Sequence, residues 1–246
     1  MSEKVIKAAL LGLGTVGNGV YKVLKNQREE MEKKIGAVVQ VEKILVRNLK
    51  KAAAKVEDPS ILTNDWKAIL EDPSIEIVIE VMGGFEPART YILEALRAGK
   101  HVVTANKDLV ASNGGELLDC AAEHQCDFLF EAAVAGGIPI IRPLKQCLAG
   151  NHIEEVIGIV NGTTNFILTK MTQEGMEFSE ALALATELGY AEADPTADIR
   201  GYDAGRKMAI MASIAFNSRV TFEDVTTEGI PISQQRISAM QKSWAV

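Results

Sequence analysis

The stretch Val5-Ile6-Lys7-Ala8-Ala9-Leu10-Leu11-Gly12-Leu13-Gly14-Thr15-Val16-Gly17 decides the fold of the first half of the chain. It places the pattern Gly-x-Gly-x-x-Gly directly after an apolar run typical of a buried strand and at the start of a helical pattern. Such glycines allow a tight turn and let a pyrophosphate approach the backbone, and the helix N-terminus supplies amide donors. The stretch therefore predicts a dinucleotide site, with a purely structural glycine turn as the alternative. The residues expected to contact the cofactor here are Gly12, Gly14, Thr15, Val16 and Gly17.

Strand-like apolar runs alternate with helical patterns up to Glu131, which is typical of a parallel sheet with crossover helices. The predicted strands cover residues 5–11, 38–46, 76–82, 101–104 and 127–131. The predicted helices cover residues 15–34, 49–55, 65–71, 87–98 and 114–124. We therefore expect an α/β fold with a Rossmann-type dinucleotide-binding domain at residues 1–132.

The character of the sequence changes after Glu131, where a loop of small residues precedes a different order of elements. We expect a helix from Ile138 to Leu148 and a long alternating strand at residues 152–160. Three further helices are predicted near residues 163–174, 178–188 and 196–217. This order indicates an α+β second domain at residues 133–246.

The composition is that of an ordinary soluble globular protein, with 47% hydrophobic and 24% charged residues. A net charge of -7 argues against nucleic acid or an anionic membrane surface as the main partner. The chain has no run of 18 apolar residues and no signal-peptide layout at its start. Cys120, Cys126 and Cys147 lack the spacing of a metal site and indicate buried thiols in a reducing, cytoplasmic compartment.

The end of the second predicted strand indicates which nicotinamide cofactor the chain prefers. An acidic residue there would bind the ribose 2′-hydroxyl of NAD, but this strand ends in Arg47-Asn48, with two lysines just beyond. Arginine at this place favours a 2′-phosphate, so Arg47 predicts NADP rather than NAD. The alternative is a solvated basic turn.

A second informative stretch runs from Leu188 to Lys207 and puts four carboxylates and a lysine around the start of an otherwise apolar helix. Asp203 and Lys207 are four residues apart, so on a helix they share a face and can pair. A buried-looking helix rarely carries such charges unless they pair or meet a polar ligand. The stretch therefore indicates either a substrate pocket or a structural ion pair at a helix start.

Lys107 ends the run His101-Val102-Val103-Thr104-Ala105-Asn106-Lys107, which we interpret as a strand and its carboxyl end. In open α/β sheets that end faces the ligand crevice, so Lys107 and Lys207 could face one site. Ammonium groups placed in this way polarise a carbonyl and deliver a proton as hydride arrives. For Lys107 alone, the alternative is a surface lysine after a strand.

Taken together, these motifs resemble the homoserine dehydrogenase family over roughly residues 5–230. The resemblance implies reversible, NAD(P)-dependent interconversion of L-homoserine and L-aspartate 4-semialdehyde, in threonine and methionine biosynthesis. Besides the glycine turn, the matching stretches are Glu80 to Gly84, Thr104 to Lys107, Glu131 to Pro139, Asn161 to Asn165 and Gly189 to Lys207.

The resemblance also implies a role for individual residues. Lys207 matches the proton donor, and Lys107 matches a second lysine that touches both substrate and nicotinamide. Glu192 matches the residue that holds the substrate amino group, with Asp198 and Asp203 in the same pocket, and Gly189 matches a cofactor contact. A monovalent cation, usually sodium, is implied with ligands matching the Glu131 carboxylate and the carbonyls of Val134, Gly136 and Ile138; oxygen ligands suit such a hard cation.

The family's catalytic core continues beyond the length of this chain, and many bacterial members add an ACT regulatory domain. The chain therefore resembles a C-terminally shortened member without that domain. The resemblance implies that residues 133–246 form a truncated substrate-binding, catalytic and dimerisation domain, with a homodimer as the family's usual assembly. Three hypotheses follow: an active homoserine dehydrogenase, a catalytically incompetent cofactor-binding fragment, or a dehydrogenase acting on a different amino-acid-derived carbonyl. The specific stretches at residues 161–165 and 189–207 argue against the third.

Overall fold

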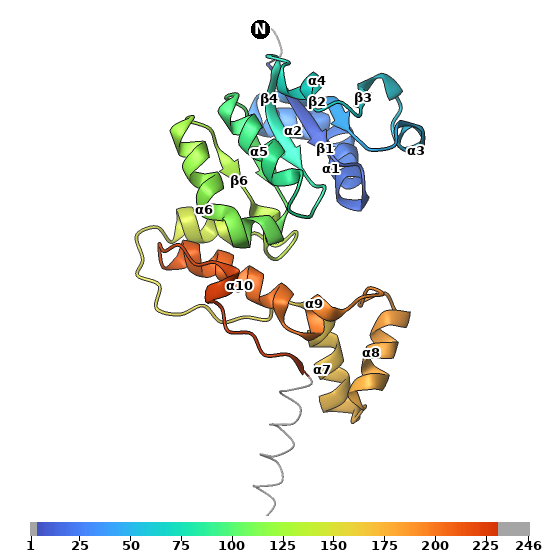
Figure 1. The fold of residues 1–246 in the computed structure, drawn as a ribbon, viewed down its shortest axis with the longest axis vertical. Coiled ribbons are helices and arrows are strands. Elements are labelled where there is room, and N and C mark those ends of the chain that lie inside the picture. The colour runs from blue at the N-terminus through green and yellow to red at the C-terminus, as the bar shows by residue number, and fades with distance from the viewer. Residues whose placement is uncertain (1–3, 231–246) are drawn as a thin grey trace, which may run out of the picture. The chain divides into compact units, whose positions relative to one another are not determined.

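A parallel six-stranded sheet forms the centre of the first of two units in a computed structural model that describes residues 4–230 (Figure 1). The two units are Met1–Pro139 and Ile140–Val246. The strand order is β3-β2-β1-β4-β5-β6, and every neighbouring pair is parallel. The strands are β1 Val5–Leu11, β2 Val38–Leu45, β3 Leu62–Thr63, β4 Ile75–Glu80, β5 His101–Thr104 and β6 Phe128–Leu129. This order confirms the predicted Rossmann-type α/β fold.

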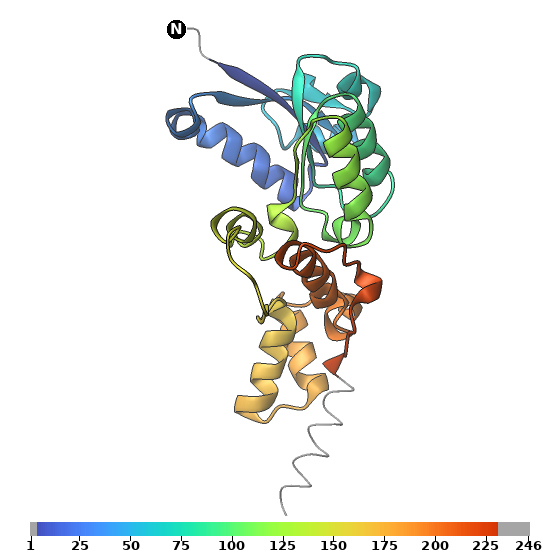
Figure 2. The ribbon, with the colours of Figure 1, turned by 90° about the vertical axis from the view of Figure 1, so that its left-hand side faces the viewer.

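Helices cover both faces of this sheet, which explains why its strands are apolar runs rather than alternating ones. Figure 2 shows α1 on one face and α5 and α6 on the other. The side chains of Leu10 and Ile44 in the central strands are completely buried beneath these helices. The helices of the unit are α1 Thr15–Asn26, α2 Arg28–Ile35, α3 Leu49–Ala53, α4 Lys67–Leu70, α5 Ala88–Arg97 and α6 Lys107–Glu123.

Two helix predictions in this unit are wrong in their bounds. The helix expected at residues 15–34 is divided into α1 and α2 at Gln27, whose backbone is not helical. Helix α6 begins at Lys107 rather than near residue 114, because the Asn106 side chain accepts a hydrogen bond from the amide of Leu109 (3.3 Å) and caps it. Lys107 is therefore the first residue of a helix and not the last of a strand.

The second unit consists of helices and irregular segments over its described residues. Helices α7 and α8 pack together through the buried side chains of Ile167, Ala181 and Ala185. Gly201 has a φ of 80° and divides the helix predicted at residues 196–217 into α9 and α10, and the helix predicted from Ile138 forms a single π-helical turn. The elements are the π-helical turn Pro143–Cys147, α7 Gly162–Glu174, α8 Phe178–Glu187, α9 Thr196–Ile199, α10 Tyr202–Ala215 and the 3-10 turn Phe222–Asp224.

The strand predicted at residues 152–160 is wrong, because none of these residues is in a strand. Strands require a hydrogen-bonding partner, and none of the strands in residues 4–230 pairs with this segment. Ile157 and Ile159 are consequently 82% and 79% exposed. The last residues of the predicted second domain, 231–246, lie outside the described part.

None of the helices in the described ranges is long and apolar enough to cross a lipid bilayer.

We predict that Lys100→Met lowers the free energy of unfolding by about 1–3 kcal/mol, because two carbonyl acceptors lose a buried donor. The Lys100 side chain is 4% exposed, and its Nζ donates to the carbonyl oxygens of Asp72 (2.6 Å) and Ile75 (2.9 Å). Urea unfolding of the first unit measures this change. The control Lys67→Met removes an exposed lysine of α4 and leaves stability nearly unchanged; equal effects of the two substitutions would contradict the prediction.

Candidate cofactor and substrate sites

The glycine turn has the geometry that phosphate binding requires. Gly12 has a φ of 100°, and its amide donates to the Leu45 carbonyl of the neighbouring strand (3.0 Å). A Cβ atom at Gly17 would overlap the carbonyl oxygen of Gly12, so α1 packs on β1 as closely as glycine allows. A Cβ at Gly14 would meet nothing within 4 Å, which leaves open space beside the free amides of α1. Thr15 and Val16 form the exposed first turn of that helix.

A cavity of about 530 Å³ lies against this turn within the first unit. Its walls are the glycine turn, the end of β2 with the start of α3, and the loop that follows β4. Arg47, Lys51 and Lys55 line it, and Lys55 also donates to the Leu13 carbonyl (2.8 Å). An acidic wall would repel a phosphorylated ribose, whereas this basic one attracts it. The residues present therefore fit a dinucleotide with an additional phosphate.

The buried carboxylate of Glu80, to which sequence reasoning gave no role, holds two loops at the carboxyl edge of the sheet. Its Oε1 accepts hydrogen bonds from the amides of Met82 (2.7 Å) and Gly83 (3.2 Å), two residues that line the cavity. Its Oε2 accepts from the Thr104 hydroxyl at the end of β5 (2.6 Å). The signal that could have identified it is a charged residue at the end of a mainly apolar strand, where Glu76, the other acidic residue of β4, is exposed.

Asn106 extends this network to Lys107. The Asn106 side-chain amide donates to the Gly84 carbonyl (2.6 Å), and its side-chain oxygen caps α6. The position of Lys107 in the first turn of α6 is thus fixed by the same loops that border the cavity. Lys107 belongs to the first unit and Lys207 to the second, so a shared site for the two lysines stays a prediction.

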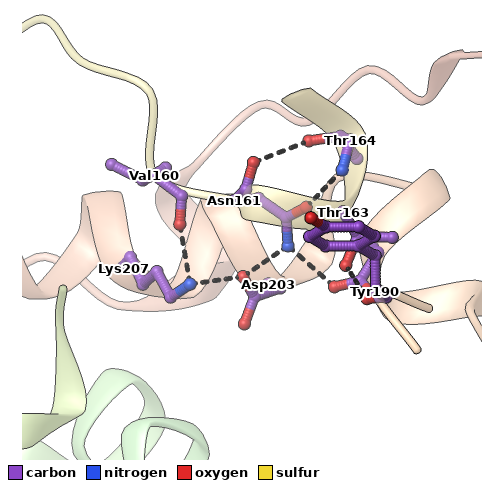
Figure 3. Close-up of polar contacts among 8 residues, drawn as sticks. Val160, Asn161, Thr163, Thr164, Tyr190, Asp203 and Lys207 are labelled. Carbon is purple, nitrogen blue, oxygen red and sulfur yellow. Dashed lines mark hydrogen bonds and ion pairs between the residues drawn. The ribbon is translucent and has the colours of Figure 1, made fainter. Parts of the chain in front are cut away.

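The predicted pair of Asp203 and Lys207 is confirmed in the second unit, where Nζ of Lys207 lies 2.6 Å from Oδ2 of Asp203 (Figure 3). The Lys207 ammonium also donates to the Val160 carbonyl (2.7 Å). Lysine has three N–H donors, so these two partners leave a third for a ligand oxygen. The Asn161 side-chain amide donates to Asp198 (2.7 Å) and to Asp203 (2.8 Å), which brings both predicted carboxylates together.

The predicted substrate residue Glu192 and the predicted cofactor contact Gly189 both lie in the segment that follows α8. Gly189 adopts a φ of 78° there, and Glu192 is exposed with no ion pair to another residue of the described ranges. The Tyr190 carbonyl accepts from the Thr163 hydroxyl at the start of α7 (2.6 Å), which holds the turn against that helix. Sequence reasoning assigned no role to Thr163, although it lies in the stretch of residues 161–165 that carried the resemblance.

The fourth carboxylate of this stretch, Asp194, has a local structural role. It accepts hydrogen bonds from the hydroxyl (2.6 Å) and the amide (3.1 Å) of Thr196 at the start of α9. These bonds stabilise the charged form, and the side-chain bond to Thr196 lowers the pKa of Asp194 most. Asp194 therefore stabilises the start of α9.

The residues expected to bind a cation form one loop of the first unit. Glu131 begins a 3-10 turn, and Ala135 and Gly136 both have positive φ values, which redirect the carbonyls between Val134 and Ile138. Residues 4–230 contain no cluster of three or more His, Cys, Asp or Glu side chains suited to a metal. The loop offers one carboxylate and backbone carbonyls, a donor set that fits a monovalent hard cation.

Comparison with known proteins gives a consistent result for both units. Residues 12–131 match the family model described as homoserine dehydrogenase, NAD binding domain, and residues 139–245 match the model described as homoserine dehydrogenase. Homoserine dehydrogenase of Bacillus subtilis (strain 168) is 49% identical over 227 residues, which are 92% of this chain and 52% of that protein. The chain spans about half the length of the curated relatives it matches.

Solved structures agree with this assignment. A homoserine dehydrogenase from Thiobacillus denitrificans superposes with a TM-score of 0.88 at 48% identity, covering 93% of this chain and 53% of that one. A hyperthermophilic archaeal homoserine dehydrogenase in complex with NADPH superposes with a TM-score of 0.75 at 27% identity, covering 90% and 75%.

We predict that Gly17→Ala abolishes NADPH binding, because the added methyl group forces α1 away from the Gly12 carbonyl and displaces the helix N-terminus. Fluorescence titration with NADPH measures the loss. Gly19→Ala is the matched control on the same helix, since a Cβ there meets nothing within 4 Å. Intact binding in the Gly17 variant would show that this close approach is not required.

Proposed function

The chain belongs to the homoserine dehydrogenase family, and we propose that it interconverts L-homoserine and L-aspartate 4-semialdehyde with NADP as the hydride carrier. The observation that carries this proposal is the Lys207 ammonium, held by Asp203 and the Val160 carbonyl with one N–H donor left. An ammonium held in this way can hydrogen-bond a reacting oxygen while its other donors keep it in place. The proposal places the chain in threonine and methionine biosynthesis.

The substrate's charges match the side chains around Lys207. Homoserine carries an ammonium, a carboxylate and the reacting hydroxyl. In the proposal Glu192 and Asp198 bind the ammonium, while Lys207 contacts the reacting oxygen. In the reducing direction, Nζ of Lys207 donates a proton to the aldehyde oxygen as hydride reaches the aldehyde carbon. Lys107 contributes a second positive charge to the same oxygen, and Asp203 keeps the Lys207 ammonium oriented.

Support for NADP comes from the basic wall of the cavity. Arg47 and Lys51 stand at the end of β2, where NAD-specific sites carry an acid. The archaeal relative named above is described in complex with NADPH. When bound, the nicotinamide ring accepts or supplies the hydride. In the proposal Gly189 adds a contact to this cofactor from the second unit.

We also propose a monovalent cation, most simply sodium, held by the Glu131 carboxylate and the carbonyls of Val134, Gly136 and Ile138. The two positive φ values within this loop support it. A homodimer is proposed because the extended segment at residues 152–160 leaves isoleucines uncovered. A reducing cytoplasmic compartment is supported by three free cysteines, of which Cys120 is buried, Cys126 is half-buried and Cys147, contrary to the prediction, is exposed.

We predict that Lys207→Ala lowers kcat for homoserine-dependent reduction of NADP by about 100-fold or more, because the reacting oxygen loses its proton partner. Steady-state kinetics of the purified chain with sodium present measure it. The matched control is Lys170→Ala, which breaks another (i, i+4) pair on α7, the partly exposed Lys170–Glu174 pair, and leaves kcat unchanged.

Near wild-type turnover of the Lys207 variant, with cofactor binding intact, would exclude the proton-donor role. No turnover by the wild-type chain, together with clear NADPH binding, would instead favour the cofactor-binding fragment. Groups from the other half of the longer relatives would then be required for chemistry.

We predict that Arg47→Asp weakens NADPH binding about tenfold or more while changing NADH binding much less, because only NADPH carries the 2′-phosphate. Isothermal titration with each cofactor measures the difference. Lys50→Asp makes the same charge change on α3 at a position outside the cavity wall, and it controls for long-range electrostatics. An equal loss for both cofactors would contradict the assignment of Arg47.

A further inference from the structure

We propose that Asn161 is a positioning residue that holds the carboxylates of Asp198 and Asp203 in their working geometry. Its side chain is 8% exposed, and all of its polar groups have partners in the second unit (Figure 3). The proposal rests on the proposed function, since it assigns Asn161 a role in the pocket of Lys207. Asn161 lies outside the sequence stretch from Leu188 to Lys207, at the N-cap of α7.

The oxygen and the nitrogen of the Asn161 side-chain amide have different roles. Its Oδ1 accepts from the Thr164 amide (2.8 Å) and caps α7, which is the ordinary role of asparagine before a helix. Its Nδ2 has two N–H donors and gives one to Oδ1 of Asp198 on α9 and one to Oδ2 of Asp203 on α10. One amide therefore ties together the starts of three helices.

The negative charges of Asp198 and Asp203 explain why a neutral amide with two N–H donors is suited to position 161. Asp198 and Asp203 both accept from the same nitrogen, so their carboxylates are close enough to repel each other. Lys207 offsets part of that repulsion, because its ammonium pairs with the same Oδ2 of Asp203 that Asn161 contacts. Asp203 is only 6% exposed, and a buried carboxylate that loses a donor is costly.

The arrangement makes Asn161 act on the ammonium through Asp203. Nζ of Lys207 is fixed by the Asp203 carboxylate and by the carbonyl of Val160, the residue before Asn161. Loss of the amide frees Asp203 to turn toward other donors, and Lys207 follows it. A displacement of this kind changes the chemical step more than cofactor binding, because most of the proposed cofactor contacts belong to the first unit.

Two substitutions distinguish the role of Asn161 as the N-cap of α7 from its hydrogen bonds to Asp198 and Asp203. Asn161→Ser keeps a good N-cap oxygen but removes both amide donors. Asn161→Asp keeps the shape and the cap oxygen but sets a third carboxylate against the other two. We expect kcat for homoserine oxidation to fall about 10- to 100-fold in the serine variant and at least as far in the aspartate variant, with the Kd for NADPH unchanged.

A double-mutant cycle measured by urea unfolding tests the hydrogen bonds from Asn161 to Asp198 and Asp203 without a measurement of activity. Asn161→Ser is expected to lower the urea midpoint of the second unit. Adding Asp198→Asn is expected to restore most of this loss, because the new amide at position 198 can donate a hydrogen bond to Asp203. The proposal would be overturned if Asn161→Ser lowered the urea midpoint equally in the wild-type chain and in the Asp198→Asn chain. It would also be overturned if the Asn161→Ser variant kept the wild-type kcat and KM. If the wild-type chain fails to oxidise homoserine, the proposed function fails for this chain, whereas the urea cycle still decides the role of Asn161.

Discussion

The parallel direction of all six strands is the constraint on which the cofactor site depends. Because every strand in the sheet runs the same way, the ends of β1, β2, β4 and β5 meet at one edge. The glycine turn, the basic wall and the loop held by Glu80 come together there although they are distant in sequence. Close packing at Gly17 then fixes the N-terminus of α1 beside the cavity.

Each unit uses a buried carboxylate in the same physical way. Glu80 in the first unit and Asp203 in the second are almost completely removed from solvent, where an unpartnered charge would be strongly destabilising. Both are satisfied by donors from separate segments of chain: Glu80 by two backbone amides and a hydroxyl, Asp203 by an amide and an ammonium. The requirement to satisfy the charge is what orders the surrounding loops. A buried carboxylate of this kind therefore positions the surrounding segments of chain, in addition to any chemical role.

The errors of sequence reasoning have identifiable causes. The start predicted for α6, near residue 114, is too late because the side chain of Asn106 caps the helix and sets its first residue at Lys107. The alternating segment at residues 152–160 has the pattern of a strand, but a pattern cannot supply the partner that a strand needs. Asn161 lies in a stretch that resembles the family, but the sequence does not indicate its role, because its partners Asp198 and Asp203 lie far along the chain.

By itself, the sequence determined the Rossmann-type first unit, the glycine turn, the basic end of β2 and the pairing of Asp203 with Lys207. These features depend on local spacing: the period of strands and helices, the steric freedom of glycine and the (i, i+4) geometry of a helix. Only the tertiary structure decided that Glu80 joins two loops and that Asn161 bridges Asp198 and Asp203. Those contacts join residues separated by long stretches of chain, and hydrogen bonds between them exist only once packing has removed water from the groups concerned.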